Sequence, residues 1–364
     1  MEAGAGRGEL TVVSAPNDPL QSPEPSREPQ HAARVCVVGA GAIGSLFAAH
    51  LARVAEVWVL TRRESHAEEL RTDGLRVSGK GAFVSHPHAT ADSSALPPCD
   101  LVIVATKATE LEAAMARLGG LLPDACVMTT QNGLGADRLV RRFGHWPVIS
   151  GVTFMSGRRH SDTYVEYELD APTWLGPSVD APPSVERVAA AGDLLVRAGL
   201  MAEVMDDMRP ALWSKLIFNA TVNVVAALTQ LPHDVHFREE ASISDLGHLV
   251  RQLVEEGKSV AHAVGVPLHD DPWDMNLHAI RRGETGEGVY RHLPSMLEDV
   301  LAARPSEVDF ITGQLVGIGL EHGVDVTLHL ALYRLMKARE ASYELALDHS
   351  EASLGDLATE AARR

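Results

Sequence analysis

Cysteine is scarce in this chain: only Cys36, Cys99 and Cys126 occur among 364 residues. The three are isolated and odd in number, and they lie in or beside apolar runs. Neither a disulfide framework nor a zinc-ligand spacing is present. We expect buried free thiols, which fit a reducing cytosol and a cytoplasmic protein. Nothing near His86 and His88, the closest histidine pair, completes a ligand set, so no metal site is predicted.

Basic residues are also in short supply, since 32 Lys and Arg face 49 Asp and Glu, for a formal net charge of −17. This balance disfavours nucleic acids and acidic membrane surfaces as partners, although a local cationic pocket could still bind a small anion. Long hydrophobic runs are missing as well. The uncharged stretch 35–49 is too short to span a bilayer and is broken by glycines, and the N-terminus lacks the pattern of a secretory signal. We therefore expect a soluble protein without a membrane partner.

The two ends of the chain differ from its middle. Residues 1–31 contain five prolines among Ser, Glu and Gln, a composition that cannot bury a core and is typical of a disordered tail. A start codon assigned too far upstream would give the same composition. A second tail is expected at 350–364.

Between these tails, strands and helices alternate first, and helices then continue alone. Short apolar runs predict strands at 35–38, 57–60, 101–105, 126–130, 163–169, 173–175 and 201–204. Helical periodicity predicts intervening helices at 43–53, 64–73, 109–118 and 184–198. Beyond Pro210 the predicted helices lie at 210–230, 239–264, 272–282, 306–322 and 328–346.

This order indicates an α/β fold class, with an N-terminal Rossmann-type domain and a C-terminal all-helical domain. The alternating part predicts a parallel sheet covered on both faces, within a domain spanning 32–207. The helical domain is expected to span 208–349. We expect the chemistry in the cleft between the two domains.

A glycine motif, Gly39-Ala40-Gly41-Ala42-Ile43-Gly44, follows the first predicted strand and opens the first helix. In dinucleotide-binding domains the first glycine makes the tight turn and the second lets the backbone approach the pyrophosphate. The third allows close packing of helix and strand. The strand and helix around the motif favour this function over an ordinary glycine-rich turn.

Three polar residues at the ends of strands extend this interpretation. Arg62 follows the second strand, where NAD-binding domains usually carry an acid, and an arginine there suits a 2′-phosphate. The cofactor predicted is therefore NADP(H), although Arg62 and Arg63 could instead be a solvated helix start. Lys107 and Asn132 also follow strands, at the edge where such sheets bind ligands. A surface lysine and a turn asparagine are the alternatives.

In the helical part, Lys215, Asn219 and Asn223 are spaced i, i+4, i+8, which places three polar groups on one face of a largely apolar helix. Such a row either feeds an internal network or lines a ligand cleft. A partly desolvated lysine has a lowered pKa and can act as a proton donor near neutrality. That is what the reduction of a ketone requires.

Taken together, the chain resembles the ketopantoate reductase (2-dehydropantoate 2-reductase) family from Arg34 to about Glu344. The elements that carry the resemblance are, in order, the motif at 39–44, Thr61-Arg62, Thr106-Lys107, Gln131-Asn132-Gly133, Trp213-x-Lys215-Leu216 with Asn219 and Asn223, Ser295-Met296-Leu297-x-Asp299, and Ser306-Glu307-Val308-Asp309.

The resemblance implies a role for each matched position. Lys215 matches the general acid. The implied substrate contacts, of which Ser295 would bind the carboxylate, are Lys215, Asn219, Asn223 and Ser295. The implied cofactor contacts are Gly39, Ala40, Gly41, Ala42, Ile43, Gly44, Arg62 at the 2′-phosphate, Lys107 and Asn132 beside the nicotinamide and ribose, and Glu307. The implied reaction reduces 2-dehydropantoate with NADPH to (R)-pantoate, in pantothenate and coenzyme A biosynthesis.

The chain departs from the family pattern at two places. His292-Leu293-Pro294 stands before Ser295 where the family often has Asn-x-Ser, and 327–330 lacks a common Pro and Asn. The first departure keeps open a reductase of another 2-oxo acid or ketone in a specialised pathway. A dinucleotide-sensing protein without activity is a further alternative, suggested by the acidic, proline-rich tail. A helical domain with large apolar faces could also form a homodimer.

Overall fold

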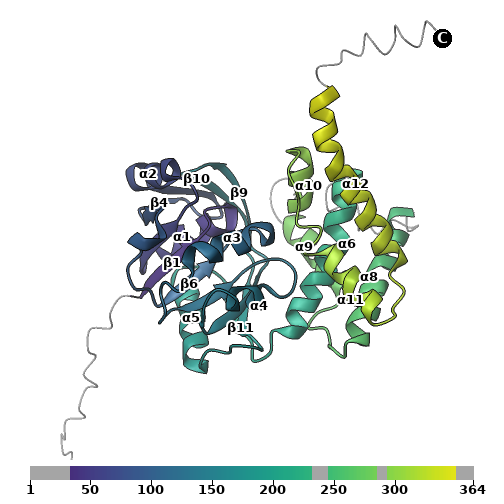
Figure 1. Ribbon diagram of the computed structural model, residues 1–364, viewed down its shortest axis with the longest axis horizontal. Coiled ribbons are helices and arrows are strands. Elements are labelled where there is room, and N and C mark those ends of the chain that lie inside the picture. The colour runs from purple at the N-terminus through teal and green to yellow at the C-terminus, as the bar shows by residue number, and fades with distance from the viewer. Residues whose placement is uncertain (1–32, 232–244, 285–292, 350–364) are drawn as a thin grey trace, which may run out of the picture. The chain divides into compact units, whose positions relative to one another are not determined.

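The computed structural model describes residues 33–231, 245–284 and 293–349 (Figure 1). The tails expected at 1–31 and 350–364 lie outside the described residues, as does the beginning of the helix predicted at 239–264. The sheet-bearing and helical parts described below belong to one compact unit that begins at Ala33.

The main sheet has eight strands in the order β12-β11-β8-β7-β6-β1-β2-β5. Their bounds are β1 Arg34–Val38, β2 Glu56–Leu60, β5 His88–Thr90, β6 Leu101–Val104, β7 Cys126–Thr129, β8 Val148–Thr153, β11 Thr173–Pro177 and β12 Ala202–Val204. All neighbours pair parallel except β8 and β11, which pair antiparallel. The prediction of a parallel sheet is wrong for this pair. Because no crossover helix joins β8 to β11, the chain returns in the opposite direction.

A second, four-stranded sheet has the order β4-β3-β10-β9. Its strands are β3 Leu75–Gly79, β4 Phe83–Ser85, β9 Ser156–Ser161 and β10 Tyr164–Leu169. Only β10 was predicted. The apolar-run criterion misses β9, because its sequence SGRRHS is polar and its side chains are largely exposed.

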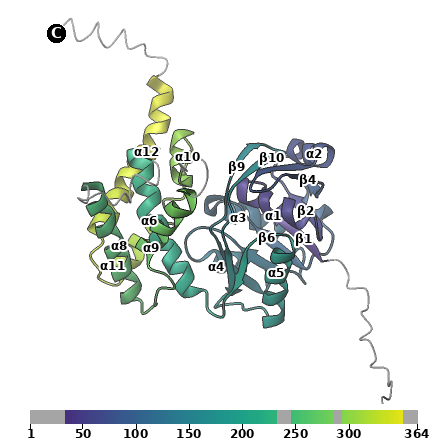
Figure 2. The same ribbon diagram turned by 180° about the vertical axis from the view of Figure 1, so that it is seen from behind.

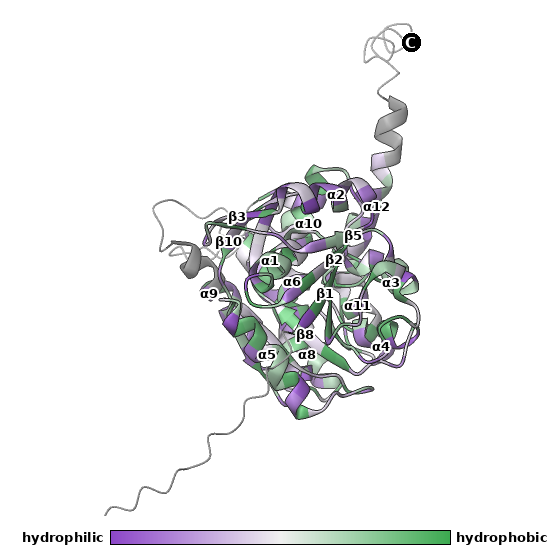
Figure 3. Cartoon of the chain, turned by 90° about the vertical axis from the view of Figure 1, so that its left-hand side faces the viewer, coloured by the Kyte–Doolittle hydropathy of each residue, from purple (hydrophilic) through white to green (hydrophobic). Residues whose placement is uncertain are grey.

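Both faces of the main sheet are buried because successive side chains of a strand point to opposite sides. Val35 and Val37 of β1 pack with residues of α1 (Ala42–Leu51), α2 (Glu64–Asp73) and α5 (Val185–Arg197). Cys36 and Val38 pack instead with α3 (Ala108–Leu118) and α4 (Ala136–Arg141). The apolar colouring of the central strands in Figure 3 reflects this two-sided burial. All three cysteines are buried free thiols, as predicted, and burial raises the pKa of each.

The helical part is built around α6 (Arg209–Thr229), whose side chains form a core with the other helices there. These are α8 (Asp245–Ala263), α9 (Pro272–Glu284), α10 (Ser295–Leu301), α11 (Thr312–Glu321) and α12 (Thr327–His349). Figures 1 and 2 both show α12 running beside α6. By length and composition α6 could cross a bilayer, but 78% of its apolar window is buried inside the protein, as in a core helix.

The helix predicted at 306–322 begins only at Thr312. Residues before it form turns, in which the Ser306 hydroxyl accepts a hydrogen bond from the Val308 amide at 3.2 Å and donates one to Glu340. The capping pattern of Ser306 and Asp309 therefore marks a turn and not a helix start. The short helix α10, which begins at Ser295, was not predicted.

Candidate functional site

The glycine motif forms the connection between β1 and α1, with Gly41 as the N-cap of the helix. Gly39 has φ +95°, in the left-handed region, and a Cβ there would meet the Thr106 side chain at 2.8 Å. A Cβ at Gly44 would overlap the Gly39 carbonyl. At Gly41, by contrast, a Cβ would have no atom within 4 Å. Two glycines are thus needed for the fold, while the third leaves room beside helix N–H groups, which fits a bound pyrophosphate.

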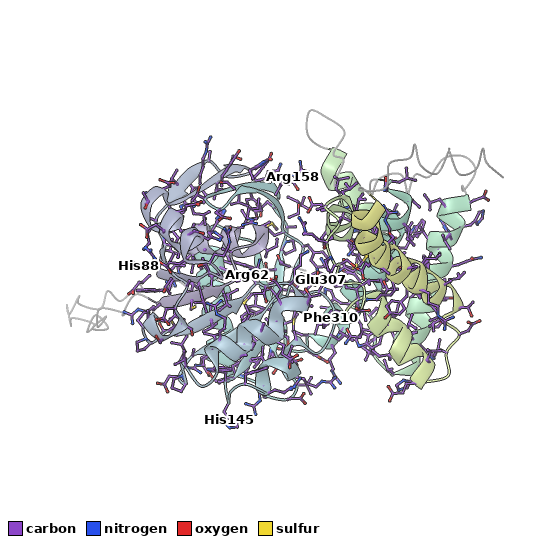
Figure 4. The ribbon with its side chains drawn as sticks, turned by 45° about the horizontal axis from the view of Figure 1, so that its top comes forward. Arg62, His88, His145, Arg158, Glu307 and Phe310 are labelled. Carbon is purple, nitrogen blue, oxygen red and sulfur yellow. The ribbon has the colours of Figure 1, made fainter. Side chains whose placement is uncertain are left out.

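Arg62 follows β2 with its side chain 77% exposed, and its Nη1 lies 2.6 Å from Oε1 of Glu110 in the first turn of α3. An exposed guanidinium beside the end of a strand fits a 2′-phosphate contact. The next residue, Arg63, is the N-cap of α2, so the alternative of a solvated helix start describes Arg63. Figure 4 marks Arg62 on the sheet-bearing part.

Lys107, the N-cap of α3, joins the two parts of the chain. Its Nζ lies 2.5 Å from Oδ1 of Asp299 in α10, and that buried carboxylate also accepts a hydrogen bond from Arg304 at 3.1 Å. Lys107 is therefore no isolated surface lysine. No role was predicted for Asp299. Its position four residues after Ser295, on the same face of a helix, was the sequence signal that it could belong to the site.

Asn132 lies at the centre of a hydrogen-bonded chain that links α3, the loop after β7, and α6. Its Nδ2 donates to Oε2 of Glu307 at 3.1 Å, and its Oδ1 accepts from Nδ2 of Asn219 at 3.1 Å. The other oxygen of Glu307 accepts from the Ala108 amide at 2.8 Å. Burial raises the pKa of Glu307, and these hydrogen bonds partly offset that shift. Asn219 thus feeds an internal network, one of the two alternatives left open by the sequence.

The loop that carries Asn132 is fixed against the helical part by its next residues. Gly133 has φ +93°, and a Cβ there would overlap the Phe310 carbonyl. Leu134 and Gln314 exchange two hydrogen bonds, at 2.7 and 2.9 Å. Glu307 and Phe310 are labelled in Figure 4, on the segment that receives this loop. The position of Asn132 is therefore determined by packing around it.

Lys215 of α6 points toward the end of β8. Its Nζ donates to the Thr153 carbonyl at 3.1 Å and lies 3.9 Å from the centre of the Phe154 ring and 5.5 Å from that of Phe218. Part of its side chain remains accessible to solvent. Desolvation by the surrounding protein lowers the pKa of Lys215 to about 7. Phe154 was not predicted as a neighbour of Lys215, because no local sequence signal marks a residue after a strand as the contact of a lysine 61 positions away.

The remaining predicted residues differ in their surroundings. Asn223 is buried, one turn beyond Asn219 on α6. Ser295 is exposed and is the first residue of α10, a helix that packs against α6. The departure at His292 falls outside the described residues, so the structure bears only on Leu293 and Pro294 beside it. The structure therefore brings Asn132, Asn219 and Glu307 together by direct hydrogen bonds, and it shows Ser295 only as a nearby exposed residue.

Two surface hollows, of about 440 and 370 Å³, lie elsewhere on the molecule. One is lined by residues of α8 and the start of α12, the other by the end of α8 and the segment 266–271. Neither includes a predicted site residue. Across 33–231, 245–284 and 293–349, no group of three or more His, Cys, Asp or Glu side chains could hold a metal ion.

The chain matches the models of a known protein family over most of its length. Residues 35–180 match the model for ketopantoate reductase PanE/ApbA, and residues 207–340 match the model for its C-terminal region. The chain belongs to the ketopantoate reductase family. It is accordingly an oxidoreductase, and the family uses NADPH, in agreement with the cofactor expected from the sequence. The Rossmann-type sheet followed by a helical region is the expected family architecture.

Individual relatives agree with this assignment. The 2-dehydropantoate 2-reductase of Pyrococcus horikoshii is 27% identical over 311 residues, covering 85% of this chain and 98% of its own. The crystal structure of a PanE/ApbA family ketopantoate reductase from Ralstonia eutropha is 26% identical with a TM-score of 0.74, covering 85% and 99% of the two chains. D-mandelate dehydrogenase with NADH and anilino(oxo)acetate shares the fold, at 23% identity, a TM-score of 0.75, and 85% and 99% coverage.

Proposed function

We propose that this protein reduces 2-dehydropantoate to (R)-pantoate with NADPH, in pantothenate and coenzyme A biosynthesis, with Lys215 as general acid. The observation that carries the proposal is the position of the Lys215 ammonium beside the Thr153 carbonyl and the Phe154 ring, where desolvation lowers its pKa to about 7 and allows proton donation near neutrality. Among the residues that the structure describes, no carboxylate forms an ion pair with it. Its proton is therefore not held by a neighbouring acid.

The sheet-bearing part, 32–207, is proposed to hold the cofactor. The backbone around Gly41 and the N–H groups at the start of α1 would bind the pyrophosphate, and Arg62 the 2′-phosphate. Lys107, Asn132 and Glu307 would lie beside the ribose and nicotinamide, where their contacts with Asp299, Asn219 and Ala108 hold them in place. When bound, NADPH supplies the hydride for the reduction.

The helical part, 208–349, is proposed to bind the substrate. Asn223 offers its amide group to the oxygens of the substrate, and Asn219 offers the part of its amide that does not bond Asn132. Ser295 offers a hydroxyl to the substrate carboxylate. As hydride reaches the carbonyl carbon, negative charge develops on the carbonyl oxygen. The Lys215 ammonium stabilises that charge and then transfers a proton from Nζ to the oxygen, which gives the alcohol.

The test is steady-state oxidation of NADPH against a panel of 2-keto acids that includes 2-dehydropantoate. We expect 2-dehydropantoate to be preferred, and Lys215→Ala to abolish turnover while NADPH still binds. Full turnover by the Lys215→Ala variant would contradict the role of Lys215. Absence of turnover with every acid would instead favour the non-enzymatic alternative.

A second candidate is a reductase for a 2-oxo acid with a bulky apolar or aromatic substituent. The rings of Phe154 and Phe218 beside Lys215 favour it, since partly exposed aromatic side chains next to the proton donor would pack against such a group. The same panel decides, because this candidate requires an aryl 2-keto acid to exceed 2-dehydropantoate in kcat/KM.

The proposal also includes a soluble, cytoplasmic protein without nucleic-acid or membrane partners, supported by the net charge of −17. A homodimer is part of it as well. Light scattering coupled to size-exclusion chromatography tests the dimer, and a monomeric mass at the enzyme's working concentration would contradict it.

A further inference from the structure

The ion pair between Arg62 and Glu110 lies at the carboxyl ends of the central strands of the main sheet, where the cofactor is proposed to bind. In the strand order, β1 lies between β2 and β6. Arg62 follows β2, and Glu110 lies in α3, the helix that follows β6. A contact of 2.6 Å between them therefore joins the segments that follow the two neighbours of β1, the strand from which the glycine motif leaves.

This pair is exposed at both ends, with 77% of the Arg62 side chain and 50% of the Glu110 side chain accessible to solvent. Exposed ion pairs contribute little to folding, so little stability would be lost if a ligand displaced Glu110 from Arg62. The pair uses Nη1 of Arg62, one of the nitrogens with which a guanidinium binds a phosphate in bidentate geometry. The carboxylate of Glu110 thus occupies a donor that a phosphate would need.

The backbone beneath the pair is held separately. Arg117, two turns along α3 from Glu110, donates from Nη2 to the Thr61 carbonyl at 3.0 Å and to the Ala91 carbonyl at 2.6 Å. The Thr61 hydroxyl also donates to the Arg63 carbonyl at 2.9 Å. The segment that carries Arg62 is therefore fixed against α3 whether or not Glu110 contacts the guanidinium.

We infer that Glu110 is a specificity-determining residue that competes with the 2′-phosphate of the dinucleotide for Arg62 and so weakens the preference for NADPH over NADH. This inference rests on the proposed cofactor site at Arg62. A 2′-phosphate carries about −1.5 to −2 charges at neutral pH and needs the guanidinium as its partner, so a carboxylate already paired with Arg62 occupies a donor that the phosphate must win. NADH has only a hydroxyl at that position and gains nothing when Glu110 loses its charge.

The test measures equilibrium binding of NADPH and NADH to the full-length protein, by protein fluorescence or calorimetry, without any keto acid. Glu110→Gln keeps the shape of the side chain and removes its charge. We expect it to tighten NADPH binding about three- to tenfold, the size of one unit-charge interaction in solvent. NADH binding should change less than twofold. The thermal midpoint should stay unchanged, because Arg117 holds the loop.

Glu112→Gln is the matched control. Glu112 lies on the same helix with a similar exposure and pairs with an arginine, but its partner is Arg142 at 3.3 Å. It removes the same net charge, and we expect both dissociation constants to stay within twofold. An equal gain in NADPH affinity with Glu112→Gln would mean a general charge effect and would overturn the inference.

Arg62→Gln separates this inference from the proposed function. If Arg62→Gln leaves the NADPH-to-NADH affinity ratio unchanged, the proposed 2′-phosphate contact itself is wrong. If it lowers that ratio while Glu110→Gln has no effect or weakens NADPH binding, only the inference about Glu110 is wrong. In the Arg62→Gln background, Glu110→Gln should lose most of its effect. A full effect there would show direct repulsion instead of competition, and would also overturn the inference.

Discussion

The side-chain amide of Asn132 donates a hydrogen bond to the carboxylate of Glu307 at 3.1 Å, across a separation of 175 positions in the chain. The same asparagine accepts from Asn219 of α6. One residue at the end of a strand thus fixes both a buried acid and the helix that carries Lys215. Groups of the sheet-bearing part and of the helical part are thereby held by a shared set of hydrogen bonds.

Replacement of Glu307 tests this network through stability. Glu307→Ala removes the acceptor of two donors, Ala108 N and Asn132 Nδ2, and we expect a loss of about 2–4 kcal/mol in the free energy of unfolding. Glu307→Gln keeps one acceptor and buries no charge, so its loss should be about 1 kcal/mol. Urea unfolding measures both values. Negligible losses in both variants would mean that these hydrogen bonds contribute nothing to stability.

The lowered pKa of Lys215 predicts a specific pH dependence of activity. A general acid must be protonated, so kcat/KM should fall as pH rises through about 7, the pKa of Lys215 in the ligand-free enzyme. The pH profile of kcat/KM measures this. Lys215→Arg keeps a charge at all these pH values, so its residual activity should not fall as pH rises through 7. A fall near pH 7 that persists in this variant would assign the titration to another group.

The same shift predicts how stability depends on pH. Between about 7 and the ordinary lysine value of 10.5, the unfolded chain binds a proton at Lys215 that the folded protein does not. The free energy of unfolding should therefore rise with pH across this window, through this group. The comparison is urea unfolding of the wild type and Lys215→Met at pH 7 and pH 9. An identical pH dependence in both proteins would show that the lysine is not desolvated.

Two alanine substitutions in the glycine motif should have opposite consequences. Gly44→Ala places a Cβ on the Gly39 carbonyl, and we expect it to cost at least about 1–3 kcal/mol of stability. The methyl group added by Gly41→Ala would contact no protein atom, so the thermal midpoint should stay unchanged. NADPH binding should weaken, because this methyl group fills the proposed pyrophosphate site. Thermal unfolding and NADPH titration test the pair. Unchanged NADPH affinity in Gly41→Ala would place the pyrophosphate elsewhere.

The contact between Lys107 and Asp299 should couple the sheet-bearing and helical parts energetically. The carboxylate is buried while the lysine is partly exposed, so we expect a coupling energy of about 1 kcal/mol in a double-mutant cycle of Lys107→Met and Asp299→Asn. The cycle is measured by urea unfolding. Strictly additive effects would show that the ion pair contributes nothing to holding the two parts together.

The order of elements was largely predictable, because short apolar runs and helical periodicity are local properties of the sequence. The strands β1, β6 and β7 are buried on both faces and read as continuous apolar runs. Local pattern does not predict a strand that forms only through tertiary pairing. β9 is polar throughout and exists through its pairing with β10.

For the site, residue types and short spacings were enough to predict the candidate groups, namely a glycine motif between strand and helix, an arginine after β2, and a lysine and two amides on one helix face. The partners of these groups depend on the tertiary structure, as with Asn132 for Asn219, Phe154 for Lys215 and Glu110 for Arg62. Those pairs lie 87, 61 and 48 positions apart. Local preferences cannot specify such contacts, because packing of the sheet against the helices brings the side chains together.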